Sequence, residues 1–287
     1  MFGKISNTLG VMRASWNVLL KNKQLLLFPL LSGICWLLVV ASFVLPVVLT
    51  KSWRPPTATA TQSQQVLYYG VLFLFYLCNY FVIIFFNAAT TACAVRSLQG
   101  QAAGLADGLR AAGNCLHLIL GWALVSATVG LLLKTIENRS EKIGQIVVSL
   151  LGVAWSVVSY LVVPILVIER KSPIAALKDS TRLVQKTWGA QVVGGFSFGL
   201  LNFLLILPAF LIVLLGVLGA GAGHPIGLAI SIGVAVVWVL LVVLIASALQ
   251  NIFRTALYLY TRDGQVAGFS DELLAGALLP KVCGSRN

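Results

Sequence analysis

The stretch GQAAGLADGLRA (100–111) recurs near the end of the chain as GQVAGFSDELLA (264–275), with the same residue at seven of its twelve positions. A third copy, SPIAALKDSTRL (172–183), keeps the alanine at Ala175 and the aspartate at Asp179. Residues 1–23 form a fourth segment of the same amphipathic kind. Pairs of long apolar runs separate the copies, so the pattern indicates an internal repeat.

The apolar runs decide the class of protein. Of the 287 residues, 59% are hydrophobic and only 10% are charged, against about 25% charged in a typical soluble domain. Each run is long enough to cross about 30 Å of hydrocarbon, and none contains Asp, Glu, Lys or Arg. The six predicted spans are approximately 24–49, 66–89, 115–133, 145–168, 192–221 and 226–250.

This order predicts an all-α membrane protein with six transmembrane helices. They would form three parallel two-helix repeats, because every unit begins and ends on the same side of the membrane. We expect cytoplasmic amphipathic helices before and after the repeats. The whole chain, 1–287, is predicted to be a single polytopic domain, with an N-terminal amphipathic helix (1–23) and a cytoplasmic tail (251–287).

The formal net charge of +12 is unevenly distributed. Fifteen of the 20 Lys and Arg residues fall on the side of the termini, and five fall in the opposite loops. This is the positive-inside pattern, so both termini are predicted to be cytoplasmic. The excess favours anionic lipid headgroups as partners rather than nucleic acid.

The amphipathic copies each predict a helix with one apolar stripe at i, i+3 and i+7 spacing. The predicted stripes are Leu9, Met12, Trp16 and Leu19; Ala102, Leu105, Leu109 and Ala112; Ile174, Leu177, Thr181 and Val184; and Val266, Phe269, Leu273 and Gly276. Such helices lie in the membrane interface or pack across the ends of the spans.

Two asparagines of the second span, Asn79 and Asn87, are candidate site residues. They are eight residues apart and therefore able to share a helix face. Hydrogen bonding between helices is the usual role in a membrane for these two asparagines and for Asn202 of the fifth span, and a polar pore lining is the alternative.

The repeated aspartates Asp107, Asp179 and Asp271 are the other candidates. Asp107 and Asp179 precede Arg110 and Arg182 by three residues, a spacing that permits ion pairs on a solvated helix face. Alternatively, the three carboxylates would form a cytoplasmic ring that guards a cation path.

No catalytic or cofactor motif is present in the sequence: GxSxG, P-loop, HExxH and dinucleotide fingerprints are all missing. The five cysteines have no CxxC spacing, and neither histidine has a ligand-type neighbour, so no metal or cofactor is predicted. We therefore expect no enzyme activity. Pro29, Pro46, Pro164 and Pro208 are expected to kink or end spans, and Pro46 and Pro208 are alternatives for opening a cavity.

Three stretches carry a family resemblance: SWNVLLKNKQLLLFPLLS (15–32), ATVGLLLKTIENRS (127–140) and WSVVSYLVVPILVIERKSPIAALKDSTRLVQKTWG (155–189). They resemble bacterial six-span integral membrane proteins that are grouped as a family of unknown function. The resemblance implies a multi-pass protein of the bacterial inner membrane.

Two functional hypotheses follow. The first is a non-enzymatic membrane scaffold or accessory subunit, whose basic face binds anionic lipid, a membrane protein partner or a second copy of the chain. The second is a passive pore or exporter for a small solute. The missing intramembrane carboxylates argue against coupling to protons or sodium.

Overall fold

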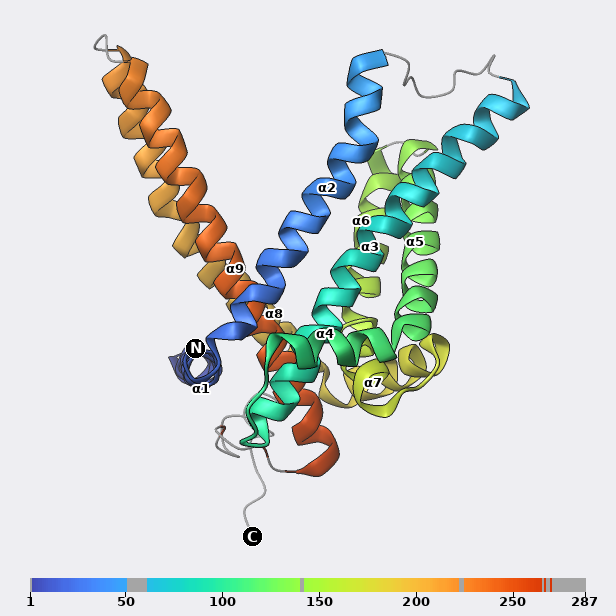
Figure 1. Ribbon diagram of the computed structural model, residues 1–287, viewed down its shortest axis with the longest axis vertical. Helices are drawn as coiled ribbons and strands as arrows, with labels where there is room; N and C mark the ends of the chain where they lie inside the picture. Colours follow the sequence, from blue (N-terminus) through green and yellow to red (C-terminus); the bar gives the residue numbers. More distant parts are fainter. Residues whose placement is uncertain are drawn as a thin grey trace. The chain divides into compact units, whose positions relative to one another are not determined.

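The computed structural model describes residues 2–50, 61–139, 142–221, 225–264, 266 and 269. Regular structure in these residues is entirely helical, without a strand, which confirms the predicted all-α class (Figure 1). In chain order the elements are α1 (Phe2–Lys21), the 3-10 helix η1 (Lys23–Leu26), α2 (Leu27–Thr50), α3 (Gln62–Leu98), α4 (Leu105–Asn114), α5 (Leu116–Arg139), α6 (Lys142–Val158), α7 (Val162–Glu169), α8 (Pro173–Gly221) and α9 (Pro225–Asp263).

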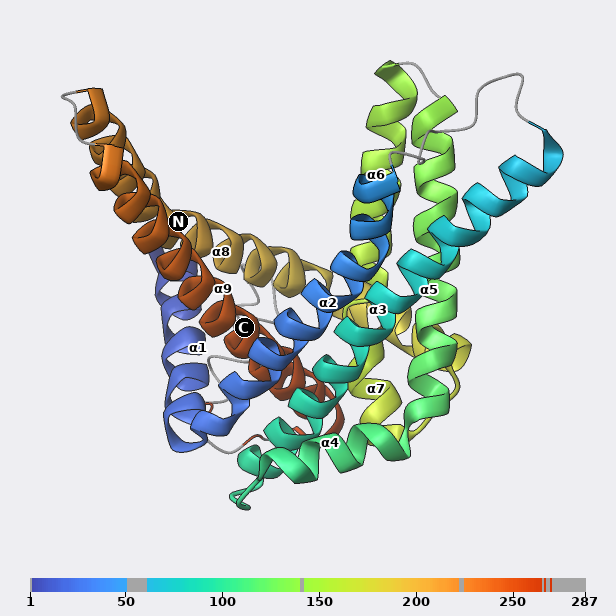
Figure 2. The same ribbon diagram turned by 45° about the horizontal axis from the view of Figure 1, so that its top comes forward.

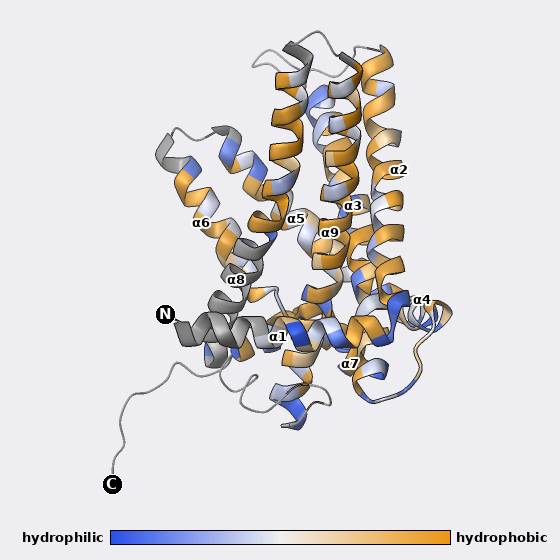
Figure 3. Ribbon diagram, turned by 90° about the vertical axis from the view of Figure 1, so that its left-hand side faces the viewer, coloured by the Kyte–Doolittle hydropathy of each residue, from blue (hydrophilic) through white to orange (hydrophobic). Residues whose placement is uncertain are grey.

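Six helical segments of the described residues are long and apolar enough to cross a membrane. Each of them overlaps one of the six predicted runs. They are Lys23–Leu49, Gln62–Leu98, Leu116–Glu137, Gln145–Glu169, Asn202–Gly219 and Ile226–Asp263. Figure 3 shows apolar residues along most of α2, where Leu38 and Leu49 are 65% and 73% exposed. Side chains of this kind are stable in contact with lipid and unfavourable in water.

The chain divides into two compact units. Unit 1 comprises Met1–Leu26, Leu98–Gly100 and Thr187–Asn287, and unit 2 comprises Leu27–Ser97 and Gln101–Lys186. Both units contain membrane-length helices, and the expectation of a single polytopic domain stays a prediction.

Two prolines coincide with breaks between helices. Pro29 lies in the first turn of α2, and its ring would clash with a helical carbonyl at Leu25, where η1 intervenes instead. Pro164 lies in the first turn of α7, and the same clash at Tyr160 falls in the gap between α6 and α7. Pro46 and Pro208, in contrast, lie inside α2 and α8, which continue through them.

Buried residues gather at one end of the long helices. In α3 the first is Asn79 and the others lie between Ile84 and Leu98, whereas Val66 near the start of that helix is 66% exposed. In α9 they concentrate between Ala248 and Leu259. The packed core of each of these helices is thus near its C-terminal end, and the remaining length is apolar and exposed.

Within unit 2, aromatic contacts join neighbouring helices. Trp122 of α5 stacks on Trp155 of α6, with ring centroids 5.6 Å apart. Phe43 of α2 meets Phe75 of α3 edge to face at 5.4 Å. These pairs add modestly to the burial of apolar surface between the helices.

Within unit 1, α8 and α9 form an antiparallel hairpin, seen side by side in Figures 1 and 2. The Trp238 indole N–H donates a hydrogen bond to the carbonyl of Leu205, at 2.8 Å. Gly216 lies so close to α9 that an added Cβ would overlap Ser231. A small residue at this crossing lets the two backbones approach.

The predicted apolar stripes are confirmed only in part: Leu19, Ala112, Val184, Val266 and Phe269 are buried, whereas other buried positions lie one residue before the predicted ones. In α4 the buried residues are Gly108 and Ala112, whereas Ala102 is exposed. In α8 they are Ala176, Ser180 and Val184, and Ile174 is 63% exposed. In α1 the buried face is Ala14, Ser15, Val18 and Leu19, and Trp16 is 40% exposed. Close packing selects small side chains at these contacts, and hydrophobicity alone does not identify them.

Candidate functional site

Asp107 lies where the end of α3 meets the start of α4. The chain reverses through Gly100, whose φ of +75° belongs to the left-handed region that glycine adopts readily. The backbone N–H of Gly104 donates to Asp107 Oδ2 at 3.1 Å, and Arg96 Nη1 lies 3.2 Å from the same oxygen. We call Arg96, Gly104 and Asp107 the Asp107 clamp, because they tie a span to the following amphipathic helix.

The clamp holds Asp107 in its charged form. The Gly104 N–H first, and then the Arg96 guanidinium, lower the pKa of the Asp107 carboxyl below its ordinary value. A carboxylate in the first turn of a helix also interacts favourably with the helix dipole. The partner predicted from spacing, Arg110, was wrong: the ion pair is with Arg96 of the preceding helix.

Close packing lies beside the Asp107 clamp. The Cys93 thiol donates to the carbonyl of Gly104 at 3.3 Å. An added Cβ at Gly108 would lie 2.7 Å from Cys93 Sγ and 2.8 Å from the carbonyl oxygen of Ala89. Position 108 therefore needs glycine because α3 and α4 are in near contact here.

Asp179 lies at the corresponding junction between α7 and α8. Lys171 Nζ donates to Asp179 Oδ2 at 2.7 Å and also pairs with Glu169, while Arg182 Nη1 lies 3.8 Å from Asp179 Oδ1. These four residues form the Asp179 clamp. The hydrogen bond from Lys171 lowers the pKa of Asp179, and reciprocally Asp179, followed by Glu169, raises the pKa of Lys171. The predicted pairing with Arg182 is present, but Lys171 is much the closer partner.

Ser180, the neighbour of Asp179, forms hydrogen bonds with backbone groups at the break between α6 and α7. Its hydroxyl donates to the carbonyl of Val158 at 2.6 Å and accepts the N–H of Leu161 at 3.2 Å. These backbone groups lie in the gap that Pro164 imposes and are therefore satisfied by a side chain instead of by the helix.

The two asparagines of α3 differ in their surroundings. Asn79 is buried, and its amide donates to the carbonyl of Phe75 in the same helix at 2.6 Å. Asn87 is half-buried near the packed end of α3. The third candidate aspartate, Asp271, lies outside the described residues.

Chemically, the two clamps are ion-paired carboxylates at helix junctions. A metal ion would need at least three suitable ligands, and the described residues contain no such group of His, Cys, Asp or Glu. Asp107 and Asp179 already satisfy their charge with cations of the same unit, which suits them to hold helices together.

Sequence reasoning missed an apolar groove in unit 1, which the interpretation of single helices does not reveal. It has a volume of about 320 Å³ and lies among α1, α8 and α9. Its lining consists of Met12, Trp16, Asn202, Leu205, Trp238, Leu241, Val242, Ile245, Ala246 and Leu249. The signal that was available is Asn202, the one strongly polar side chain in the fifth apolar run.

Asn202 is the polar feature of this groove. Its Oδ1 is enclosed and accepts no hydrogen bond from the residues that the structure describes. An unsatisfied buried acceptor costs about 1–3 kcal/mol, and because this oxygen is enclosed by protein atoms a ligand in the groove does not reach it.

Six described helices that are long and apolar enough to cross a membrane are compatible with a multi-pass helical membrane protein. The chain belongs to DUF6159, a family of unknown function, whose model matches residues 66–269. No curated protein and no solved structure shows a significant match to the chain.

Proposed function

We propose that this protein is a non-enzymatic scaffold or accessory subunit of the bacterial inner membrane. Its basic cytoplasmic face would bind anionic lipid and a membrane protein partner or a second copy. The observation that carries the proposal is the state of the repeated carboxylates: Asp107 pairs with Arg96 near the end of α3, and Asp179 pairs with Lys171 between α7 and α8. Carboxylates used in this way stabilise helix junctions and leave no open ring of ligands for a permeating cation.

Three coincidences support the triplicated hairpin plan. Gly100 and Gly264 occupy equivalent positions in their copies and have φ values of +75° and +77°. When the predicted stripes are aligned, Ser15, Gly108 and Ser180 fall at one position, and all three are buried. The two described aspartates, Asp107 and Asp179, directly precede Gly108 and Ser180, and each is paired with a base that precedes its helix.

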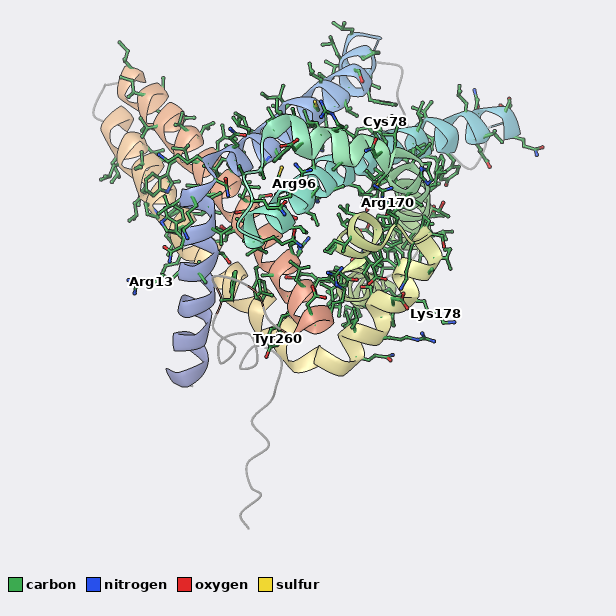
Figure 4. The ribbon with its side chains drawn as sticks, turned by 60° about the horizontal axis from the view of Figure 1, so that its bottom comes forward. Arg13, Cys78, Arg96, Arg170, Lys178 and Tyr260 are labelled. Carbon is green, nitrogen blue, oxygen red and sulfur yellow. The ribbon has the colours of Figure 1, made fainter. Side chains whose placement is uncertain are left out.

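The cytoplasmic assignment is supported by cations that project from the amphipathic segments. Arg13 and Lys178 are exposed, and Figure 4 shows both pointing away from the ribbon. Each basic residue near an anionic membrane surface contributes about 1 kcal/mol to attraction. Exposed cations of this kind, on α1 in unit 1 and on α8 in unit 2, each suit lipid headgroups or an acidic partner.

The test is crosslinking in native membranes followed by affinity purification. A scaffold should recover the same membrane protein, or a second copy of itself, in repeated preparations. Repeated recovery of the uncrosslinked chain alone would contradict the proposal. Solute flux into proteoliposomes above the level of empty liposomes would favour the pore instead.

A further inference from the structure

The groove of unit 1 has the shape and chemistry of a lipid site. From Trp238 to Leu249 its lining follows α9 over twelve residues, about 16 Å at the helical rise. Apart from Asn202 and the indole nitrogens its walls are apolar, and it lies along segments of membrane length. A long, narrow apolar slot suits an extended alkyl chain, since the volume is at the lower end of ligand sites.

The residues of α1 indicate where a headgroup would lie. Met12 and Trp16 line the groove, and Arg13 lies between them in sequence with its side chain exposed. Among the described residues Arg13 forms no ion pair, unlike Arg96 and Lys171. Leu20, one turn beyond Trp16, is 51% exposed. A tryptophan, a leucine and an arginine exposed on one helix flank are typical of the membrane interface.

Inside the groove, the polar groups of Asn202 and Trp238 are not open to a ligand. The Oδ1 of Asn202 is enclosed by protein atoms, so a ligand in the groove does not reach it. The indole N–H of Trp238 is already bound to the carbonyl of Leu205. The groove therefore offers a ligand apolar contacts, and the nearby charge that would select a headgroup is Arg13.

We propose that this groove binds an anionic phospholipid, such as phosphatidylglycerol. One acyl chain occupies the slot among α1, α8 and α9, and the phosphate pairs with Arg13. The inference deepens the proposed function and rests on its assignment of the basic face to anionic lipid.

The test uses the full-length protein, delipidated in mild detergent and titrated with phosphatidylglycerol or phosphatidylcholine. Bound lipid is counted by native mass spectrometry. We expect one phosphatidylglycerol to bind with about fivefold preference, and Arg13→Gln to remove that preference, since one cation near an anionic group contributes about 1 kcal/mol. Equal affinity for both lipids in the unmodified protein would overturn the proposal.

A second pair of variants tests the slot itself. Ala246→Phe fills the groove and should lower lipid occupancy about tenfold, a size of loss consistent with excluding several buried methylenes. Val243→Phe is the matched control, because Val243 is on the same helix, 46% exposed and outside the lining. Equal occupancy in both variants would contradict the site.

The arginine variant keeps the proposal testable if Ala246→Phe fails to fold, because Arg13 is on the surface. Lipid selectivity is measured on the purified chain and needs no protein partner. A negative lipid-selectivity result would therefore count against the lipid site and not against the crosslinking result. Conversely, failure to recover a partner would count against the scaffold and not against the lipid site.

Discussion

At the scale of single residues, the repeated aspartates are visible in the sequence, but their ion-pair partners are not. The aspartates stand out because they recur, yet the closest partner of each comes from the preceding segment of chain: Arg96 for Asp107 and Lys171 for Asp179. Spacing within a helix predicts only local pairs. The sequence therefore predicts which carboxylates matter, and the tertiary contact decides what they bind.

Gly108→Ala should destabilise the protein by about 1–3 kcal/mol, because the new methyl group would clash with Cys93 and the backbone of Ala89. Gly113→Ala, in the same helix with nothing within 4 Å of the added atom, should be neutral or slightly stabilising. Thermal unfolding in mild detergent, followed by circular dichroism, measures both. Equal midpoints for the two variants would contradict the close contact of α3 and α4.

Asp107→Asn should lower the unfolding midpoint at neutral pH by at most about 3 °C, since the clamp is exposed. The pKa of Asp107 is lower in the folded protein than its ordinary value of 3.8. The stabilisation is therefore complete above that value and is lost as pH falls through the folded pKa. Unfolding midpoints from pH 7 to pH 3 should converge for the two proteins at the acid end; a constant difference would refute the assignment.

At the scale of elements, prolines and small residues determine where helices end and touch. The prediction that Pro29 and Pro164 lie at kinks or span ends agrees with η1 and with the gap before α7. The buried stripes were predicted less well, because the positions of Gly108 and Ser180 require a small side chain or a hydrogen-bonding one. A moment based on hydrophobicity assigns such residues to the polar face.

Ser180→Ala should cost about 1–3 kcal/mol, because it leaves the Val158 carbonyl and the Leu161 N–H without their side-chain partner. Thr181→Ala is the control, since the Thr181 hydroxyl bonds only to the carbonyl of Leu177 in its own helix. Heat unfolding in detergent compares the variants. If Thr181→Ala lowered the stability more than Ser180→Ala, Ser180 would not be the residue that satisfies the backbone groups at this break.

At the scale of the whole molecule, composition predicts the membrane class and the approximate positions of the spans. Apolar runs are visible in any window of about 20 residues, and each of the six matches a helix in the described residues. The groove of unit 1 was not predictable, because its lining joins α1, at the start of the chain, to the distant hairpin of α8 and α9. The orientation in the membrane rests on charge distribution and stays a prediction.

Cysteine labelling tests this orientation. In a background without the five native cysteines, Lys178→Cys should react with an impermeant maleimide only after cells are opened, because position 178 is predicted to face the cytoplasm. Thr61→Cys, exposed and just before α3, should react in intact cells. Labelling of position 178 from outside would overturn the proposed topology and both functional hypotheses.

The gathering of buried residues near the C-terminal ends of α3 and α9 has a consequence for tolerance to mutation. Toward their N-terminal ends these helices are apolar and exposed, and lipid accommodates one aliphatic side chain about as well as another. Replacement of one apolar residue by another in these parts should have little effect on stability. Ala89 and Ala256 are 0% exposed, so even one extra carbon atom at these positions should destabilise the fold. A saturation mutagenesis scan should therefore find most substitutions tolerated in the N-terminal half of each helix and few tolerated in its C-terminal half.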